Sequence, residues 1–336
     1  MEMDKKTSLT KSIPDLMEKW QRYKRGLKGI KITDWCISSD YCFGDPDKLD
    51  VATFTIFPID CMPTIYKEIN NFLPRDIKNV TYFSEIELNY IKTSKYFFSI
   101  SIIVNNIKYT FNRNKVFKHL SELLQIKETE LPQEIPISDF QKSRRKLTTF
   151  YNYIKQKSYN HKLMAEIQFV AQTVSSIIEF LLIKEKGKIV GWCSDRGYIT
   201  SFNEGIIFNL VQSYVHQYIK GRISKYQLAF PPELKEKHKA FLGDNFIRVP
   251  DILTGAMSSL VMTDKGLTVQ KAKHGSLIGH CIVDNPHIII LVCDCLENDK
   301  TFWQRAFFES IDKSPILKYS KELLEQFKNQ MNELKE

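Results

Sequence analysis

The chain has 336 residues, of which 43% are hydrophobic and 26% charged, an ordinary globular composition. Gly and Pro are scarce, at 13 and 12 residues, which excludes collagen, low-complexity linkers and wholesale disorder. The longest purely apolar stretch, 288–293, is far short of the about 20 residues that a membrane span needs, and the first residues lack the apolar core of a secretory signal. Seven cysteines, an odd number in a long chain, do not resemble a disulfide framework. We therefore expect a cytoplasmic protein with no membrane partner.

The net charge of +9 is concentrated in two segments. Residues 1–31 carry nine Lys or Arg against four acids, and residues 141–157 carry six with no acid. Aromatic residues are interleaved with both, which is the expected footprint of a phosphate-rich partner such as nucleic acid. A lysine-rich solvated surface with no partner would give the same counts. The candidate nucleic-acid-binding residues in the second segment are Lys142, Arg144, Arg145, Lys146 and Lys155.

The first third of the chain predicts a short helix followed by strands. Residues 14–28 have helical apolar spacing, and a second helix is expected between Pro63 and Phe72. Runs rich in β-branched and aromatic residues predict strands at 30–40, 51–57, 80–90 and 96–111.

The remainder predicts an alternation of helices and strands. The clearest helix is 160–184, with an apolar stripe at i, i+3, i+4 and i+7. Further helices are expected at 113–126, 203–219, from Pro250 and from about Pro315; strands at 188–194, 225–230 and 245–249; and a hairpin within 267–296. The pattern is that of an α/β fold, a mixed sheet flanked by helices. We divide it into a basic N-terminal helix (1–29), a domain at 30–262 with a basic insertion near 113–160, and a C-terminal extension at 263–336.

Three aspartates stand at the ends of predicted strands. Asp40 ends the first strand, Asp195 ends the strand at 188–194, and Asp251 follows the strand at 245–249. Two-metal phosphoryl chemistry needs several hard oxygen ligands that converge on cations about 3.5–4 Å apart. Each residue also has an ordinary structural interpretation: a turn residue for Asp40, an Arg196 partner or helix cap for Asp195, and a helix N-cap for Asp251.

The order of these aspartate motifs resembles a large bacterial family of unknown function that has the ribonuclease H-like fold. Its members open with an Asp-Glu-Ser-Gly motif, carry a later strand-end Asp, and close with an Asp-Leu-hydrophobic-small-Gly-Ala type motif. Asp40, Asp195 and Asp251 with Gly255 and Ala256 match these three places, over about residues 30–262. The first motif departs from the family, because Tyr41-Cys42-Phe43 replaces Glu-Ser-Gly.

The resemblance implies a ribonuclease H-like mixed sheet of about five strands with helices on both sides, and metal-dependent phosphodiester cleavage. In that reading Asp40, Asp195 and Asp251 are catalytic and hold Mg²⁺ or Mn²⁺. A fourth carboxylate could be Glu85, Glu87 or Glu204. Many such bacterial proteins act in phage defence or mobile elements, so the resemblance extends to that setting.

Two other site types have weaker support in the sequence. His280, Cys281, His287, Cys293 and Cys295 lie within sixteen residues, but their spacing does not match the usual zinc patterns. A buried strand explains Cys293 and Cys295 better, because residues two apart on a strand share one face. Cys193 is a weak nucleophile candidate, since no histidine is near it in sequence.

Two functions therefore remain open. The first is a metal-dependent nuclease. The second is a non-catalytic module on the same scaffold that binds nucleic acid or a protein partner, which the altered first motif favours.

Overall fold

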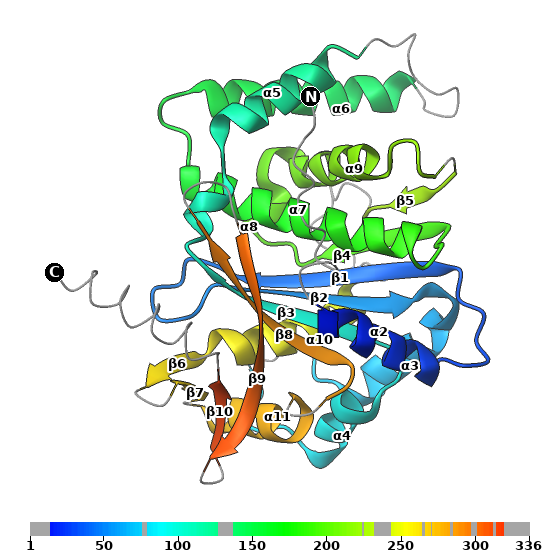
Figure 1. Cartoon of the computed structure of the whole chain (residues 1–336), viewed down its shortest axis with the longest axis vertical. Coiled ribbons are helices and arrows are strands. Elements are labelled where there is room, and N and C mark those ends of the chain that lie inside the picture. The colour runs from blue at the N-terminus through cyan, green and yellow to red at the C-terminus, as the bar shows by residue number, and fades with distance from the viewer. Residues whose placement is uncertain are drawn as a thin grey trace, which may run out of the picture.

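The structure is a computed structural model. It describes residues 14–75, 79–126, 137–223, 225–231, 243–263, 266–269, 271–282, 285–296, 301–311 and 314–318. It confirms the α/β class: a mixed sheet lies between two layers of helices (Figure 1).

The centre of the molecule is a six-stranded part of the sheet in the order β5-β4-β1-β2-β3-β8. β1 pairs antiparallel with β2, and β2 pairs antiparallel with β3, whereas β4 and β8 run parallel to their neighbours β1 and β3. These strands are β1 (Asp34–Cys42), β2 (Val51–Pro58), β3 (Phe98–Asn105), β4 (Ile189–Ser194), β5 (Gln227–Ala229) and β8 (Ile288–Cys295). Every residue of β2 is buried, as expected of a strand covered on both faces.

Beyond β8 the sheet continues through β9 (Thr301–Ile311), β10 (Ser314–Lys318), β7 (Gly266–Val269) and β6 (Leu260–Thr263). Figure 1 shows this part bending away from the central strands. The strand β10 occupies the place where we expected a C-terminal helix to begin; the remainder of that helix lies outside the described residues.

One face of the central sheet is covered by α7 (His161–Ile183), α9 (Ile206–Ile219) and α2 (Pro14–Gly26). A further pair, α5 (Arg113–Leu124) and α6 (Ile137–Lys155), lies outside α7 and α9 (Figure 1). α7 confirms the helix predicted at 160–184, and its apolar stripe is buried. By length and composition it is also the one helix among the described residues that could cross a membrane, and 72% of its most apolar window is buried inside the fold.

The opposite face is covered by α3 (Met62–Phe72), α4 (Glu85–Thr93), α10 (Asp244–Ser258) and α11 (Ala272–Leu277). The strand predicted at 80–90 is wrong, because α4 occupies most of it. Ser84 and Glu87 form a reciprocal capping box that satisfies two N-terminal backbone donors and starts this helix. The hairpin predicted within 267–296 is also wrong, since α11 separates β7 from β8.

The aromatic residues of the N-terminal helix belong to the core. Trp20 and Tyr23 are 1% and 0% exposed, and Trp20 packs against Trp35 and Phe98 with ring centroids 5.3 and 5.1 Å apart. The indole N–H of Trp20 donates to Oε1 of Glu185 at 2.8 Å, and Lys24 forms an ion pair with the same carboxylate. Trp20 and Tyr23 are therefore unavailable for stacking on nucleic-acid bases.

Candidate active site

Asp40 lies near the end of β1, in the middle of the sheet. It pairs with Thr53 of β2 on one side, and β4 is the parallel neighbour on the other. The carboxyl ends of parallel neighbours meet at one edge, so β4 ends beside Asp40. Asp195 follows β4 directly, and its backbone N–H donates to the carbonyl oxygen of Ser39 at 3.0 Å. Asp40 and Asp195, both expected at strand ends, therefore lie at the same edge of the sheet.

Asp195 is exposed, and the chain after it is tied to the start of α10. Nη2 of Arg196 lies 3.0 and 2.9 Å from the two carboxylate oxygens of Asp244, the first residue of α10. Arg196, an expected partner of Asp195, is instead paired with Asp244. This ion pair holds the end of β4 against the helix that carries Asp251.

Asp251 lies in the middle of α10, so its interpretation as a helix N-cap is wrong. The helix begins at Asp244 and includes residues 245–249, which we predicted to be a strand. Pro250 is inside the helix and has no N–H for the carbonyl oxygen of Phe246, its partner one turn earlier. Oγ of Ser38 donates to that carbonyl instead, at 2.9 Å, and so anchors α10 on β1.

The packing of α10 brings Asp251 over the end of β1. Thr254, one turn after Asp251, donates from Oγ1 to the carbonyl oxygen of Asp40 at 3.3 Å. The apolar face of α10, including Leu253 and Ala256, is buried against the sheet. Ser38 and Thr254 thus fix the helix on both sides of Asp251.

The electrostatics of Asp40 show that the charges of the other two aspartates act on it. Burial, then the charge of Asp251, then that of Asp195 together raise the pKa of Asp40 to about 8. Hydrogen bonds from Tyr41 and Thr254 offset part of this shift. A carboxyl group that is 9% exposed and faces two like charges has an environment suited to a cation. Among the described residues, however, no three His, Cys, Asp or Glu side chains form a group already arranged to hold a metal ion.

A second polar cluster adjoins the aspartates, and sequence reasoning missed it. Glu166 of α7 is 2% exposed and accepts a hydrogen bond of 2.8 Å from the hydroxyl of Tyr198, the first residue of α8 (Tyr198–Ser201). Burial raises the pKa of Glu166, and the positive charge of Lys162 and the negative charge of Asp50 also act on it. The signal in the sequence is an acid at position 166, between the stripe residues Met164 and Ile167 of the helix at 160–184.

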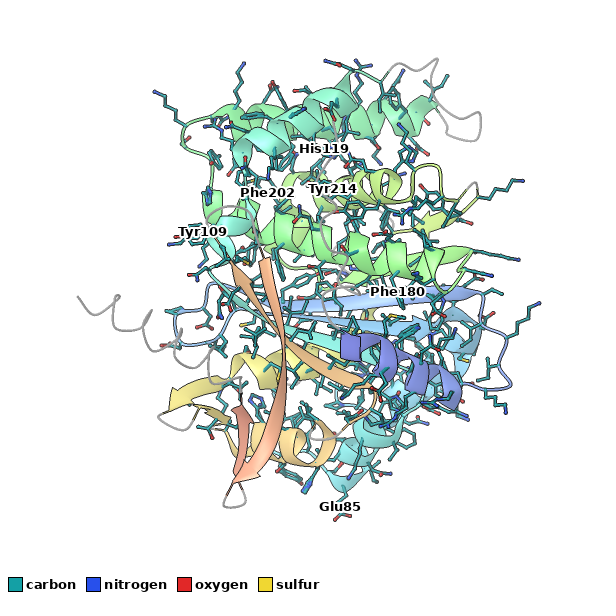
Figure 2. The ribbon with its side chains drawn as sticks, viewed as in Figure 1. Glu85, Tyr109, His119, Phe180, Phe202 and Tyr214 are labelled. Carbon is teal, nitrogen blue, oxygen red and sulfur yellow. The ribbon has the colours of Figure 1, made fainter. Side chains whose placement is uncertain are left out.

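The fourth-carboxylate candidates lie elsewhere in the fold. Glu85 and Glu87 are in the first turn of α4, on the α10 face of the sheet, and Glu87 is engaged in the capping box. Figure 2 shows Glu85 at the far end of the molecule from Phe202, which follows α8. Glu204 forms an ion pair with Arg145 at 3.1 Å. Glu166 is linked to the end of β4 through its partner Tyr198, which follows Asp195 by three residues.

The basic segment forms α6, and its members differ in environment. Lys146 is 5% exposed and donates from Nζ to the carbonyl oxygen of Glu204 at 2.7 Å, so its expected contact with phosphate is wrong. Arg144 donates to the carbonyl oxygen of Leu124 at 3.2 Å but is exposed, as is Arg145. Lys142 and Lys155 are exposed as well.

Six of the seven cysteines are buried, and Cys42 is half-buried. All seven are free thiols, and Cys293 and Cys295 on β8 are 0% and 1% exposed. Their sulfur atoms lie 3.9 Å apart on one face of the strand, which confirms the buried-strand interpretation. Cys193, also buried, donates to the carbonyl oxygen of Ile37 at 3.5 Å.

No family model, curated protein or solved structure matches this chain.

Proposed function

We propose that this chain is a metal-dependent nuclease with a ribonuclease H-like fold, and that Asp40, Asp195 and Asp251 form its active site. The observation that carries the proposal is the placement of three carboxylates, from β1, the end of β4 and α10, such that the charges of Asp195 and Asp251 both act on the buried Asp40. A protein gains nothing in stability from such repulsion, so a functional role accounts for it best.

The fold supports the proposal in its general plan. The resemblance implied a mixed sheet of about five strands with helices on both faces, in which an antiparallel meander precedes the helix–strand alternation. Strands β1, β2 and β3 form that meander, and α7, β4, α9 and β5 follow it in the chain. The match of a general plan is weaker support than the placement of the carboxylates, because one fold can serve many functions.

The donor set suits a hard divalent cation. Carboxylate oxygens are the ligands that Mg²⁺ and Mn²⁺ prefer, and Asp40, Asp195 and Asp251 would hold the ion or ions. Bound there, the metal would activate a water molecule and stabilise the leaving oxygen of a phosphodiester. Asp40 supplies a rigid ligand because β1 is paired on both sides, and Asp251 approaches from a helix fixed by Ser38 and Thr254.

The test is cleavage of end-labelled DNA and RNA, with Mn²⁺ and with EDTA, by the parent chain and by Asp251→Asn. Asn keeps the size of Asp but removes the charge that the cation needs. We expect cleavage that requires Mn²⁺ and is lost in the variant, with a melting temperature in EDTA no lower than that of the parent, because the variant removes a charge that repels Asp40. Equal cleavage by the variant would remove Asp251 from the mechanism.

The second function, a non-catalytic binding module on the same scaffold, is favoured by one observation. The residues after Asp40 are Tyr41, Cys42 and Phe43, and Tyr41 is used inside the fold: its ring stacks on Phe43 with centroids 5.9 Å apart, and its hydroxyl bonds Ser39 at 2.5 Å. A chain that binds nucleic acid or a protein but cleaves no substrate in Mn²⁺ would have this function.

A further inference from the structure

We propose that the site takes single-stranded nucleic acid, with an unpaired base stacked on Tyr198 and the sugar–phosphate backbone following the basic turn between α6 and α7. This inference rests on the proposed function for the identity of the reaction, but it concerns binding and is tested without catalysis.

Tyr198 is an exposed aromatic residue just after the end of β4. Its side chain is 53% exposed, which is unusual for a large aromatic residue, and it follows Asp195 by three residues. Its hydroxyl does not point to solvent: it donates to Oε2 of the buried Glu166 at 2.8 Å. One end of the ring is thereby tethered to α7 while much of its surface stays accessible. A ring held in place in advance loses less conformational entropy when a base stacks on it.

The basic turn starts one helical turn from this tether. Lys162 precedes Glu166 by four residues in α7, a rise of about 6 Å along the helix. Lys155, Lys157 and Lys162 are exposed, and the chain has no acid between Asp139 and Glu166. Successive cations along one path attract a phosphate backbone and release its counterions.

The turn is held in a fixed shape by Arg113. Nη2 of Arg113 donates to the carbonyl oxygen of Lys155 at 2.8 Å and to that of Gln156 at 3.3 Å. The guanidinium group also lies 5.0 Å from the ring centroid of Tyr159, in the same turn. Arg113 thus fixes the backbone of the turn that carries the exposed lysines.

A stacking ring next to a cationic path is the recognition mode of single strands. Base–aromatic stacking requires an unpaired base with a free face, which a duplex does not offer, and it tolerates any base sequence. A basic surface without a ring would bind duplex and single strand through phosphates alike. The exposed ring of Tyr198 is what distinguishes the two.

The experiment measures binding by fluorescence anisotropy in EDTA, with a labelled thymidine 20-mer and with the same strand in a duplex. The full chain is compared with Tyr198→Ala, Tyr198→Phe and the control Tyr82→Ala. Tyr82 is 74% exposed and lies just before α4, on the α10 face of the sheet. We expect Tyr198→Ala to weaken single-strand binding roughly 5- to 150-fold, the range for one lost base–aromatic stack. Tyr198→Phe keeps the ring and should lose only a few-fold, and Tyr82→Ala should equal the parent.

Two results would overturn the inference. In the first, Tyr198→Ala binds the single strand as tightly as the parent does; in the second, Tyr198→Ala loses affinity by the same factor for the single strand and for the duplex. Melting temperatures of the variants show whether they fold, and Tyr198→Phe separates the ring from the tether. The outcome is independent of cleavage. If the chain binds single strands selectively through Tyr198 but cleaves nothing in Mn²⁺, the nuclease is rejected and the single-strand site is kept. If it cleaves nucleic acid but Tyr198 has no role in binding, the nuclease is kept and the single-strand site is rejected.

Discussion

Ser38 on β1 donates a hydrogen bond of 2.9 Å to the carbonyl oxygen of Phe246 on α10, the acceptor that Pro250 leaves without a helical N–H. This bond joins the strand that carries Asp40 to the helix that carries Asp251. Ser38 is two residues before Asp40, and Phe246 is five residues before Asp251. The relative position of the two aspartates depends on it directly.

Ser38→Ala should therefore destabilise the protein, because it leaves a buried carbonyl oxygen unpaired. We expect a loss of roughly 1–3 kcal/mol in the free energy of unfolding, measured by urea denaturation. Pro250→Ala supplies a backbone N–H at position 250 that can donate to the carbonyl oxygen of Phe246. Ser38→Ala should therefore lower the free energy of unfolding less in the Pro250→Ala background than in the parent. A double-mutant cycle with no coupling between Ser38 and Pro250 would contradict this account.

Asp40→Asn should stabilise the metal-free protein at high pH. The pKa of Asp40 is raised to about 8 in the folded state and is close to 3.9 when the chain unfolds. Between these values the folded state binds more protons than the unfolded state, so the contribution of Asp40 to stability falls as pH rises. At about 1.4 kcal/mol per pKa unit the total is up to roughly 6 kcal/mol.

The measurement is the urea midpoint of parent and variant in EDTA at pH 5 and pH 8.5. We expect the variant to be slightly the more stable at pH 5 and much the more stable at pH 8.5. Parallel stability curves across this range would show that the pKa of Asp40 is not raised in the folded protein.

How much of this site the sequence predicts depends on the kind of contact involved. The positions of Asp40 and Asp195 follow from strand runs that end in a polar residue, a local pattern. The position of Asp251 inside α10 does not, because proline is favoured at the start of helices and only the hydroxyl of Ser38, 212 residues earlier in the chain, allows Pro250 inside this one. The pairing of Glu166 with Tyr198 is likewise tertiary, and neither residue alone marks it.

The basic residues of α6 should separate into two classes. Lys142→Ala and Arg144→Ala should each weaken nucleic-acid binding and reduce the slope of log affinity against log salt by roughly 0.7–0.9, since both residues are exposed. Lys146→Met should instead lower stability, because it removes the donor to the carbonyl oxygen of Glu204. Salt titrations and melting curves check the two effects, and an unchanged slope in Lys142→Ala and Arg144→Ala would reduce α6 to a solvated surface.

Trp20→Ala should destabilise the fold by roughly 3–5 kcal/mol, as for other large-to-small core substitutions. It removes a side chain that is 1% exposed and leaves Glu185 without its indole donor. The exposed control Tyr82→Ala should change stability by less than about 0.5 kcal/mol. Trp20→Ala that keeps its stability but loses nucleic-acid affinity would reverse our assignment of the N-terminal helix to the core.

The central claim is that Asp40, Asp195 and Asp251 together hold a divalent cation. Its most direct measurement is isothermal titration of the full chain with Mn²⁺ at pH 8.5, alongside Asp251→Asn and the control Asp139→Asn, whose exposed carboxylate is in the first turn of α6. The account predicts saturable Mn²⁺ binding by the parent and by Asp139→Asn, and at least tenfold weaker binding by Asp251→Asn. Equal Mn²⁺ affinity in all three proteins, or no binding by the parent, would contradict it.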